Sequence, residues 1–370
     1  MTRFAGTAGL VLVGLLASCA RAETFATFPG FDDWFDRNPP TAALPTESER
    51  ALLHRYRPIF FVPTGAPGPI DFYADYIGSG RLIVDEKIHE RVTPSRLSTH
   101  VHDPEAVFEH EPGDRRPEPV AYGRVDREAL PPVGEITFLT WHFVFRYSGL
   151  PAELPGWQEL LAGLLGDRDD WHQLDHYTAA TLALAPGERP LALILQHHNH
   201  LRSYWFGEDL ELPADGRARI AAAVRSNELY PRPDTTAHER VVRFLEADNV
   251  VWLATGAAEN PWTAAHDRIE PGRHRAYRLA FLPQTDPFYR FHGRLGEERM
   301  LPGRDGPPGA DYKTWPAFMS RVLQMCAFRW PADADPDDVA DLRRLLADPA
   351  DEEARRRLFD DCRAFVRARL

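Results

Sequence analysis

One stretch of the sequence, residues 136–147, reads ITFLTWHFVFRY. Its side chains alternate with a period of two, which is the pattern of a β-strand whose two faces meet different surroundings. One face is apolar and aromatic, and it predicts the core of a β-sandwich. The other face becomes polar towards its end and predicts a pocket wall, with His142 and Arg146 as candidate ligand-binding residues. The first face carries Leu139, Trp141, Phe143, Phe145 and Tyr147, and the second carries Ile136, Phe138, Thr140, His142, Val144 and Arg146.

Further short apolar runs follow the same pattern on both sides of this strand. A Pro- and Gly-containing turn at residues 185–190 separates predicted strands at 174–184 and 191–198, and residues 199–200 turn the chain into 201–206. Other predicted strands lie at 58–62, 250–253, 276–282 and 289–292. Short strands separated by turn signals predict a mainly β chain, with an antiparallel β-sandwich over residues 48–300.

The pattern changes in residues 301–370, where a linker at 301–311 precedes helical signals. Asp335-Pro336 and Asp348-Pro349 each fit an N-cap followed by proline at the first helical position. We therefore expect a small C-terminal α-helical appendage. Two cysteines, Cys326 and Cys362, fall on apolar helix faces there. They form a disulfide if those faces pack together, and are otherwise two buried free thiols.

Composition limits the classes of function. The 370 residues include 44% hydrophobic and 26% charged side chains, as in globular proteins, and 33 prolines, which favour loops and short elements. The formal net charge of −12 argues against sequence-independent binding of nucleic acid, which needs a basic surface.

The N-terminus carries a targeting signal. Arg3 precedes an apolar run, residues 8–17, which is too short to span a membrane and is typical of a signal peptide. The run ends in Leu16-Ala17-Ser18-Cys19, which resembles the cleavage box of bacterial lipoproteins. This predicts a signal peptide at 1–18, lipidation of Cys19, and a tether at 19–47. The acyl chains would anchor the protein in the membrane of a bacterial cell envelope, facing the periplasm or the surface. The alternative is an ordinary signal peptide cut near Ala20 or Ala22.

An acidic cluster precedes the strand at 174–184. Asp167, Asp169 and Asp170 are followed by Trp171 and His172. Asp170 and His172 are two residues apart, so they point to one side of an extended segment. Carboxylate oxygens favour calcium or magnesium, and imidazole favours zinc or manganese, so the cluster is a candidate divalent-cation site. The alternative is a solvated loop.

A second cluster, His197-His198-Asn199-His200, ends an apolar strand. His198 could complete the cation shell, while His197 and His200 are candidate ligand-binding residues. Histidines at such a position serve as metal ligands, general bases or charge switches. Glu228, in the run Ser226-Asn227-Glu228, is a further candidate, although that run is also typical of an ordinary strand end.

The order of these motifs resembles the vacuolar-protein-sorting-sixty-two-like family and, more distantly, the necrosis-inducing NLP cytolysins. The resemblance covers roughly residues 50–235 and is diffuse. It implies a β-sandwich and, from the cytolysin motif GHRHDWE, a divalent cation used to dock on sphingolipid headgroups. Here the heptapeptide keeps Gly166, Arg168, Asp170 and Trp171, but Asp167, Asp169 and His172 replace the two histidines and the glutamate. Asn227 also stands where the closing family motif usually has histidine, so cytolytic activity is not implied. The supporting segments are 52–61, 138–149, 166–172, 196–198 and 226–231.

Three hypotheses follow for the function. In the first, an envelope lipoprotein binds a ligand, a glycan or a lipid headgroup, through the cation site. In the second, the protein is a metal-dependent hydrolase in which His197, His198 or Glu228 is the general base. In the third, it is a structural envelope protein without a site. The ligand-binding hypothesis leads because of the family resemblance.

Overall fold

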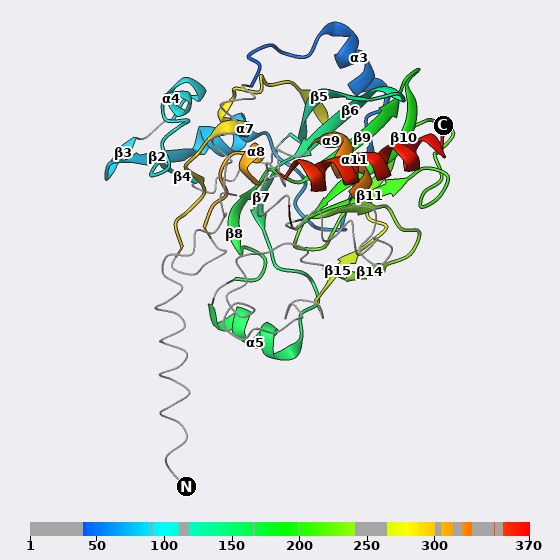
Figure 1. Cartoon of the computed structure of the whole chain (residues 1–370). Helices are drawn as coiled ribbons and strands as arrows, with labels where there is room; N and C mark the ends of the chain where they lie inside the picture. Colours follow the sequence, from blue (N-terminus) through cyan, green and yellow to red (C-terminus); the bar gives the residue numbers. More distant parts are fainter. Residues whose placement is uncertain are drawn as a thin grey trace.

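Two β-sheets pack face to face in the computed structural model, which describes residues 40–89, 92–110, 118–165, 167–198, 200–240, 265–299, 305–313, 320–327, 344 and 351–370 (Figure 1). The larger sheet has six strands and the smaller has four. The order of the first is β11 (His200–Trp205), β10 (Arg189–His197), β9 (Ala179–Ala185), β6 (Gly134–Phe143), β5 (Val120–Leu130) and β17 (Arg278–Ala280). The order of the second is β13 (Leu229–Pro231), β12 (Arg219–Ala222), β1 (Ile59–Val62) and β16 (Arg273–His274).

The predicted mainly β fold is confirmed. The β11–β10–β9–β6–β5 ladder is antiparallel throughout, while β17 pairs with β5 and β12 with β1 in parallel. The predicted strand at 174–184 is two strands, β8 (His172–Asp175) and β9, and β8 pairs instead with β7 (Phe145–Ser148). The predicted strand at 250–253 lies outside the described residues.

The alternating segment is divided: residues 136–143 fall in β6, and 145–147 fall in β7, which pairs with β8 in a separate sheet. Within β6 the predicted core face is buried between the sheets, but the face predicted as a pocket wall packs against apolar side chains instead. Leu139, Trp141 and Phe143 are fully buried between the two sheets. The ring of Phe143 stacks on Phe60 of β1 with centroids 4.3 Å apart. Each such side chain contributes about 1.5–3 kcal/mol on burial, so this face supplies much of the sandwich core.

The opposite face of the large sheet is covered by helices from the C-terminal region. Phe138 packs in one cluster with α9 (Arg321–Ala327) and α11 (Glu352–Arg367), and in Figure 1 α11 lies across the strands of this sheet. Cys326 and Cys362 join these two helices in a disulfide, with Cα atoms 5.3 Å apart. The helical appendage is therefore a third layer. Asp351 caps α11, whereas the predicted caps Asp335 and Asp348 lie outside the described residues.

A buried ion-pair network fastens the helical layer to the sheet. Arg124 of β5 lies 2.8 Å from the carboxylate of Asp311 in α8 (Ala310–Lys313) and 3.1 Å from that of Asp126. The carboxylate of Glu128, also on β5, accepts hydrogen bonds from the backbone N–H groups of Arg321 and Val322. These bonds satisfy donors at the start of α9 that the helix itself leaves unpaired.

The remaining elements surround the sandwich. An apolar cluster separate from the sandwich core and from the cluster under α9 and α11 includes Phe72, Phe108, Tyr122, Phe288 and Tyr289. The predicted strand at 289–292 is wrong, because residues 287–290 form a helix that Asp286 caps and Pro287 begins. These elements are α3 (Glu47–Arg55), η1 (Phe72–Tyr76), η2 (Ile77–Ser79), β2 (Gly80–Val84), β3 (Lys87–His89), α4 (Pro94–Thr99), β4 (Val107–His110), α5 (Gly156–Leu165), β14 (Ala237–Arg240), β15 (His266–Ile269), α7 (Pro287–Arg290) and β18 (Arg294–Leu295).

Candidate functional site

The turn between β10 and β11 holds two of the predicted histidines. Strand β10 is apolar and buried over most of its length, and His197 closes it with only 2% of its surface exposed. His198 follows in the left-handed region, with φ of 49°, and its carbonyl accepts a hydrogen bond from the side-chain amide of Gln196. The side chain of His198 keeps 11% exposure, so it lies at the boundary between the interior and solvent.

Two buried carboxylates hold the imidazole of His198. Its Nε2 lies 2.7 Å from Oδ2 of Asp267 in β15, and its Nδ1 lies 3.5 Å from Oε1 of Glu228. Glu228 comes from the segment between β12 and β13. Three segments that are distant in the sequence thus converge on one side chain, and they bring together two of the predicted residues, His198 and Glu228.

Asp267 is the centre of this arrangement, which we call the His198 network: His197, His198, Ser226, Glu228, Tyr230 and Asp267. The hydroxyl of Ser226 donates to Oδ1 of Asp267 over 2.7 Å, and the hydroxyl of Tyr230 donates to Oδ2 over 2.8 Å. The ring of Tyr230 also stacks on His197, with centroids 4.1 Å apart. Burial by itself would raise the pKa of Asp267. The charge of His198 and the hydrogen bonds from His198, Ser226 and Tyr230 outweigh it and lower that pKa, so the carboxylate stays ionised.

The backbone around the network is strained at three non-glycine residues. Arg225 and Asn227 have φ of 71° and 61°, and His198 joins them in the left-handed region. Such residues cost about 1–3 kcal/mol each and cluster at functional sites. Asn227 is fixed by a hydrogen bond from its side-chain amide to the carbonyl of Tyr147, over 2.8 Å. These three positions make the network a candidate functional site.

The acidic loop lies beside the network and is tied to it through Arg225. Oδ1 of Asp169 is 2.7 Å from Nε of Arg225, and the backbone N–H of Gly149 donates to the carbonyl of Arg225. A Cβ at Gly149 would come within 2.8 Å of the carbonyl oxygen of Arg168 and 3.0 Å of that of Arg225, so only glycine permits this approach. The strand end Ser148-Gly149, the acidic loop and the 226–228 segment therefore meet in space.

The predicted metal ligands have other contacts. The carboxylate oxygens of Asp170 accept two hydrogen bonds from Nη2 of Arg299, at 3.0 and 3.1 Å. Asp167 accepts a hydrogen bond from the backbone N–H of Asp169, and Nε2 of His172 lies 3.3 Å from the hydroxyl of buried Tyr177. In the described part of the chain, no three His, Cys, Asp or Glu side chains are arranged to hold a metal ion. A cation at the acidic loop would have to displace Arg299 from Asp170, and the cation site stays a prediction.

The other predicted ligand-binding residues are placed apart from these contacts. His142 is buried between the rings of Phe288 and Tyr289, at centroid distances of 5.7 and 5.5 Å. Its burial, aided by the charge of Arg124, lowers its pKa well below the ordinary value. Arg146 lies on β7, half-buried. His200 pairs its backbone with His197, and its side chain lies outside the described residues.

This geometry supports two kinds of chemistry. Nε2 of His198 is occupied by Asp267, so a polar ligand would meet the ring at Nδ1, in place of the 3.5 Å contact with Glu228. His198 can act there as a general base only in its neutral form. The hydroxyl of Ser226 donates its hydrogen bond to Asp267 and not to a histidine, so the network is not the arrangement of a serine nucleophile activated by histidine. The sequence signals had missed Asp267, because the run Ala265-His266-Asp267-Arg268 contains no motif that singles it out.

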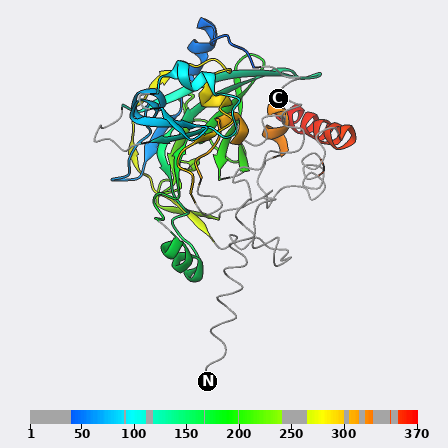
Figure 2. The same cartoon turned by 90° about the vertical axis from the view of Figure 1, so that its left-hand side faces the viewer.

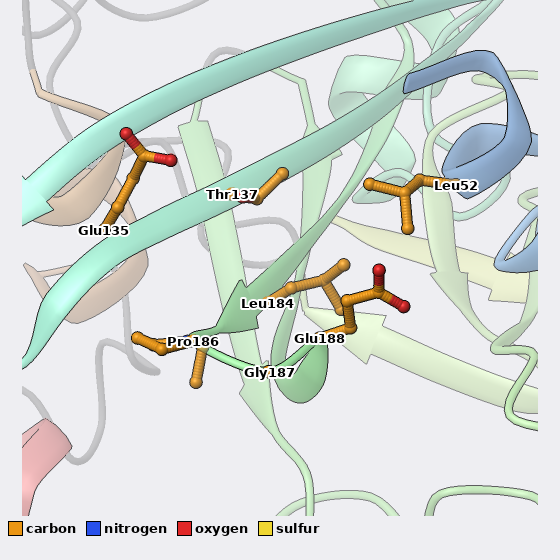
Figure 3. A pocket seen from close by; sticks show the side chains of 8 residues that line it. Leu52, Glu135, Thr137, Leu184, Pro186, Gly187 and Glu188 are labelled. Carbon is orange, nitrogen blue, oxygen red and sulfur yellow. The ribbon is translucent and has the colours of Figure 1, made fainter. Parts of the chain in front are cut away.

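A separate groove of about 320 Å³ lies between α3 and the ends of β6 and β9 (Figure 3). Leu52, Thr137, Leu184 and the turn at residues 186–188 line it, with Glu135 and Glu188 at its sides. Glu188 forms an ion pair with Arg55, and Glu135 lies 3.6 Å from Arg127. The groove is at the β9–β10 turn, and β10 carries the chain from there to His197. It is therefore at the other end of the strand from the His198 network.

Comparisons with known proteins were made for the whole chain. No family model matches it, and no curated protein matches it. A solved structure described as "Toxin fold for microbial attack and plant defense" is similar over 65% of this chain and 76% of that chain, with 12% sequence identity and a TM-score of 0.29. At a TM-score this low, the overlap does not establish a shared fold.

Proposed function

We propose that the protein is a bacterial envelope lipoprotein whose β-sandwich binds a polar ligand, a glycan or a lipid headgroup, at the His198 network. The lipoprotein part is supported by the Leu16–Cys19 box. The Cys326–Cys362 disulfide also supports it, because disulfides persist in oxidising compartments such as the periplasm and the cell surface.

The observation that carries the binding proposal is the fixed position of His198. Its imidazole reaches the protein boundary while buried Asp267 and Glu228 hold it from two sides. The ionised carboxylate of Asp267 makes a short, strong hydrogen bond, so the imidazole is oriented before any ligand arrives. A hydroxyl-rich ligand can use such a group as a directional hydrogen-bond partner.

The test is a binding titration with the purified chain. Soluble glucose, galactose and N-acetylglucosamine oligosaccharides are compared with glycerol 3-phosphate and phosphoethanolamine, by calorimetry and by thermal shift. We expect saturable binding of one class, weakened at least about tenfold in His198→Ala, which corresponds to about 1.4 kcal/mol. His100→Ala is the matched control, since His100 also faces a carboxylate, Asp103, at 3.7 Å.

Two results would count against the proposal. Equal loss in both variants would mean that the effect is not local to the network. No binding by any probe would favour a structural envelope protein. Repeating a positive titration with a chelator decides whether the predicted cation takes part.

A hydrolase is the second candidate, and the 2.7 Å pair of His198 and Asp267 is the observation that favours it. A base oriented by a carboxylate is the arrangement used for general base catalysis. With Ser226 hydrogen-bonded to Asp267, the neutral form of His198 would activate a water molecule through Nδ1, the nitrogen that faces Glu228 at 3.5 Å. Incubating the same oligosaccharides and a phosphodiester with the protein tests this. Product that forms with the wild type and not with His198→Ala would establish hydrolysis, and binding without product would exclude it for these substrates.

A further inference from the structure

Helix α5 (Gly156–Leu165) stands away from the sheets. It connects β7 to β8, and both views show it at the lower end of the molecule, beyond the strands (Figures 1 and 2). Its base is fixed by the pairing of Glu153 with His266 and by the bond from the backbone N–H of Leu150 to the carbonyl of Arg168. The helix is thus a projecting element on a defined stalk.

The sequence of α5 is unusual for a helix in that position. GWQELLAGLL contains a tryptophan, four leucines and an alanine, and its only charged residue is Glu159. The carboxylate of Glu159 forms an ion pair with Arg168. Leu160 is 67% exposed, the largest value among the large hydrophobic side chains that the structure describes. Leu160 is therefore the observed apolar contact point of a helix whose sequence is apolar.

Length and charge limit what can cover this helix. Ten residues extend about 15 Å, about half the hydrocarbon thickness of a bilayer. Among the described residues, no helix is both long and apolar enough to cross a membrane. Leucine and tryptophan in a short, nearly uncharged helix suit the boundary between lipid headgroups and acyl chains. In a chain of net charge −12, apolar insertion is the means of lipid contact, since attraction to anionic lipid is absent.

We propose that α5 inserts its exposed Leu160 into the lipid surface to which the acyl chains at Cys19 hold the protein. This inference rests on the lipid anchor of the proposed function and adds a second, protein-made contact with the same membrane. The segment between Cys19 and Pro40, where the described chain begins, reaches at most about 70 Å when extended. The proposal requires Pro40 to lie within that reach of the bilayer that α5 enters. With both contacts made, α5 would fix the orientation of the protein on the membrane.

Site-specific fluorescence tests this in the lipidated full chain. Leu160→Cys adds one free thiol for an environment-sensitive fluorophore, since Cys326 and Cys362 are paired and Cys19 is acylated. Ile88→Cys is the matched control, because Ile88 is a 55% exposed hydrophobic residue on β3, a different element. Both labelled proteins are mixed with phosphatidylethanolamine–phosphatidylglycerol vesicles that contain nitroxide-labelled lipid. We expect a shift to shorter wavelength and quenching for the label at Leu160, and neither for the label at Ile88.

Flotation of the same vesicles separates the two proposals. Protein that floats while the Leu160 label stays in water overturns the α5 contact and leaves the anchor standing. Protein that does not float overturns both. A wavelength shift at Leu160 without vesicles would show that protein covers the helix, which also overturns the inference. Thermal denaturation of both labelled variants, compared with the wild type, checks that each is folded.

Discussion

His198 and Asp267 are 69 residues apart in the sequence, yet Nε2 of the imidazole lies 2.7 Å from Oδ2 of the carboxylate. Asp267 also accepts hydrogen bonds from Ser226 and Tyr230, so one buried carboxylate organises the candidate site. Because three side chains depend on this carboxylate, the site is sensitive to the charge at a single position.

Asp267→Asn should therefore lower both stability and ligand binding. The amide cannot accept from all three donors, and removing one partner of a buried charge pair costs about 3–5 kcal/mol. Urea unfolding of the variant measures the cost. Asp103→Asn, which breaks the more exposed His100–Asp103 pair, should cost less than about 1 kcal/mol. Equal costs for the two variants would contradict the central role of Asp267.

Reduction of the disulfide should loosen the helical layer. The bond closes a loop between residues 36 apart, and a loop of that length is worth about 3–4 kcal/mol. Urea unfolding with and without a reductant measures the difference. The double variant Cys326→Ser/Cys362→Ser should start at the lower stability and show no response to reductant. A response in that variant would assign the effect to something other than this bond.

Acid should destabilise the fold through its buried histidines. Burial lowers the pKa of His176 from 6.5 to about 3, and burial with the charge of Arg146 lowers that of His110 to about 4. Below pH 6.5 the unfolded chain binds protons that the folded chain does not, so the free energy of unfolding falls as the pH is lowered. Above pH 6.5 the neutral ring of His176 adds its full contribution to stability. As the pH falls from 6.5 towards about 3, the pKa of His176 in the folded chain, that contribution is lost.

His176→Phe provides the measurement for this effect. The ring of His176 stacks on Phe72 and meets Phe288 edge-on, so phenylalanine suits the site. Between about pH 6.5 and about pH 4.5, the variant should lose about 2–3 kcal/mol less stability than the wild type. His100→Gln, at a more exposed site, should leave the pH dependence unchanged. A wild-type slope in His176→Phe would show that His176 does not carry the effect.

Arg299 would compete with a divalent cation for the carboxylate of Asp170. If the acidic loop binds a divalent ion, elemental analysis of protein purified without chelator should find near-stoichiometric metal, lost in Asp170→Ala/His172→Ala. Arg299→Gln should then raise the affinity for the ion, since the guanidinium and the cation use the same carboxylate. Absence of metal from all three proteins after soaking in calcium, magnesium, zinc and manganese would show that the cation prediction is wrong.

The sequence predicts β6 best, because its apolar and polar side chains alternate with the period of a strand. Trp141 and Phe138 sit on opposite faces of β6, and each is buried against a different layer. The error at residues 289–292 has an identifiable source. Asp286-Pro287 is the same cap-and-proline signal as Asp335-Pro336, but the aromatic residues that follow it also fit the pattern of a strand.

The candidate site was only half predictable, for a physical reason. His197, His198 and Glu228 stand out as polar residues at the ends of apolar strands. Asp267 does not, because its role depends on long-range contacts: β15 pairs with β14, and the side chains of Ser226 and Tyr230 reach Asp267 from another part of the chain. Likewise Asp170 and His172 are two residues apart, as the expected site required, but Arg299 takes up the first and Tyr177 the second.

The third layer has a consequence for when the chain can finish folding. Phe138 and the rest of its sheet face are covered by residues as late as 351–370. During synthesis or translocation from the N-terminus, this apolar face stays uncovered until residues 351–370 have emerged. If the protein is exported as we propose, the covering helices arrive and are cross-linked only after passage through the membrane. Late closure would thus keep the chain loose enough to be threaded, and oxidation would then lock it on the far side.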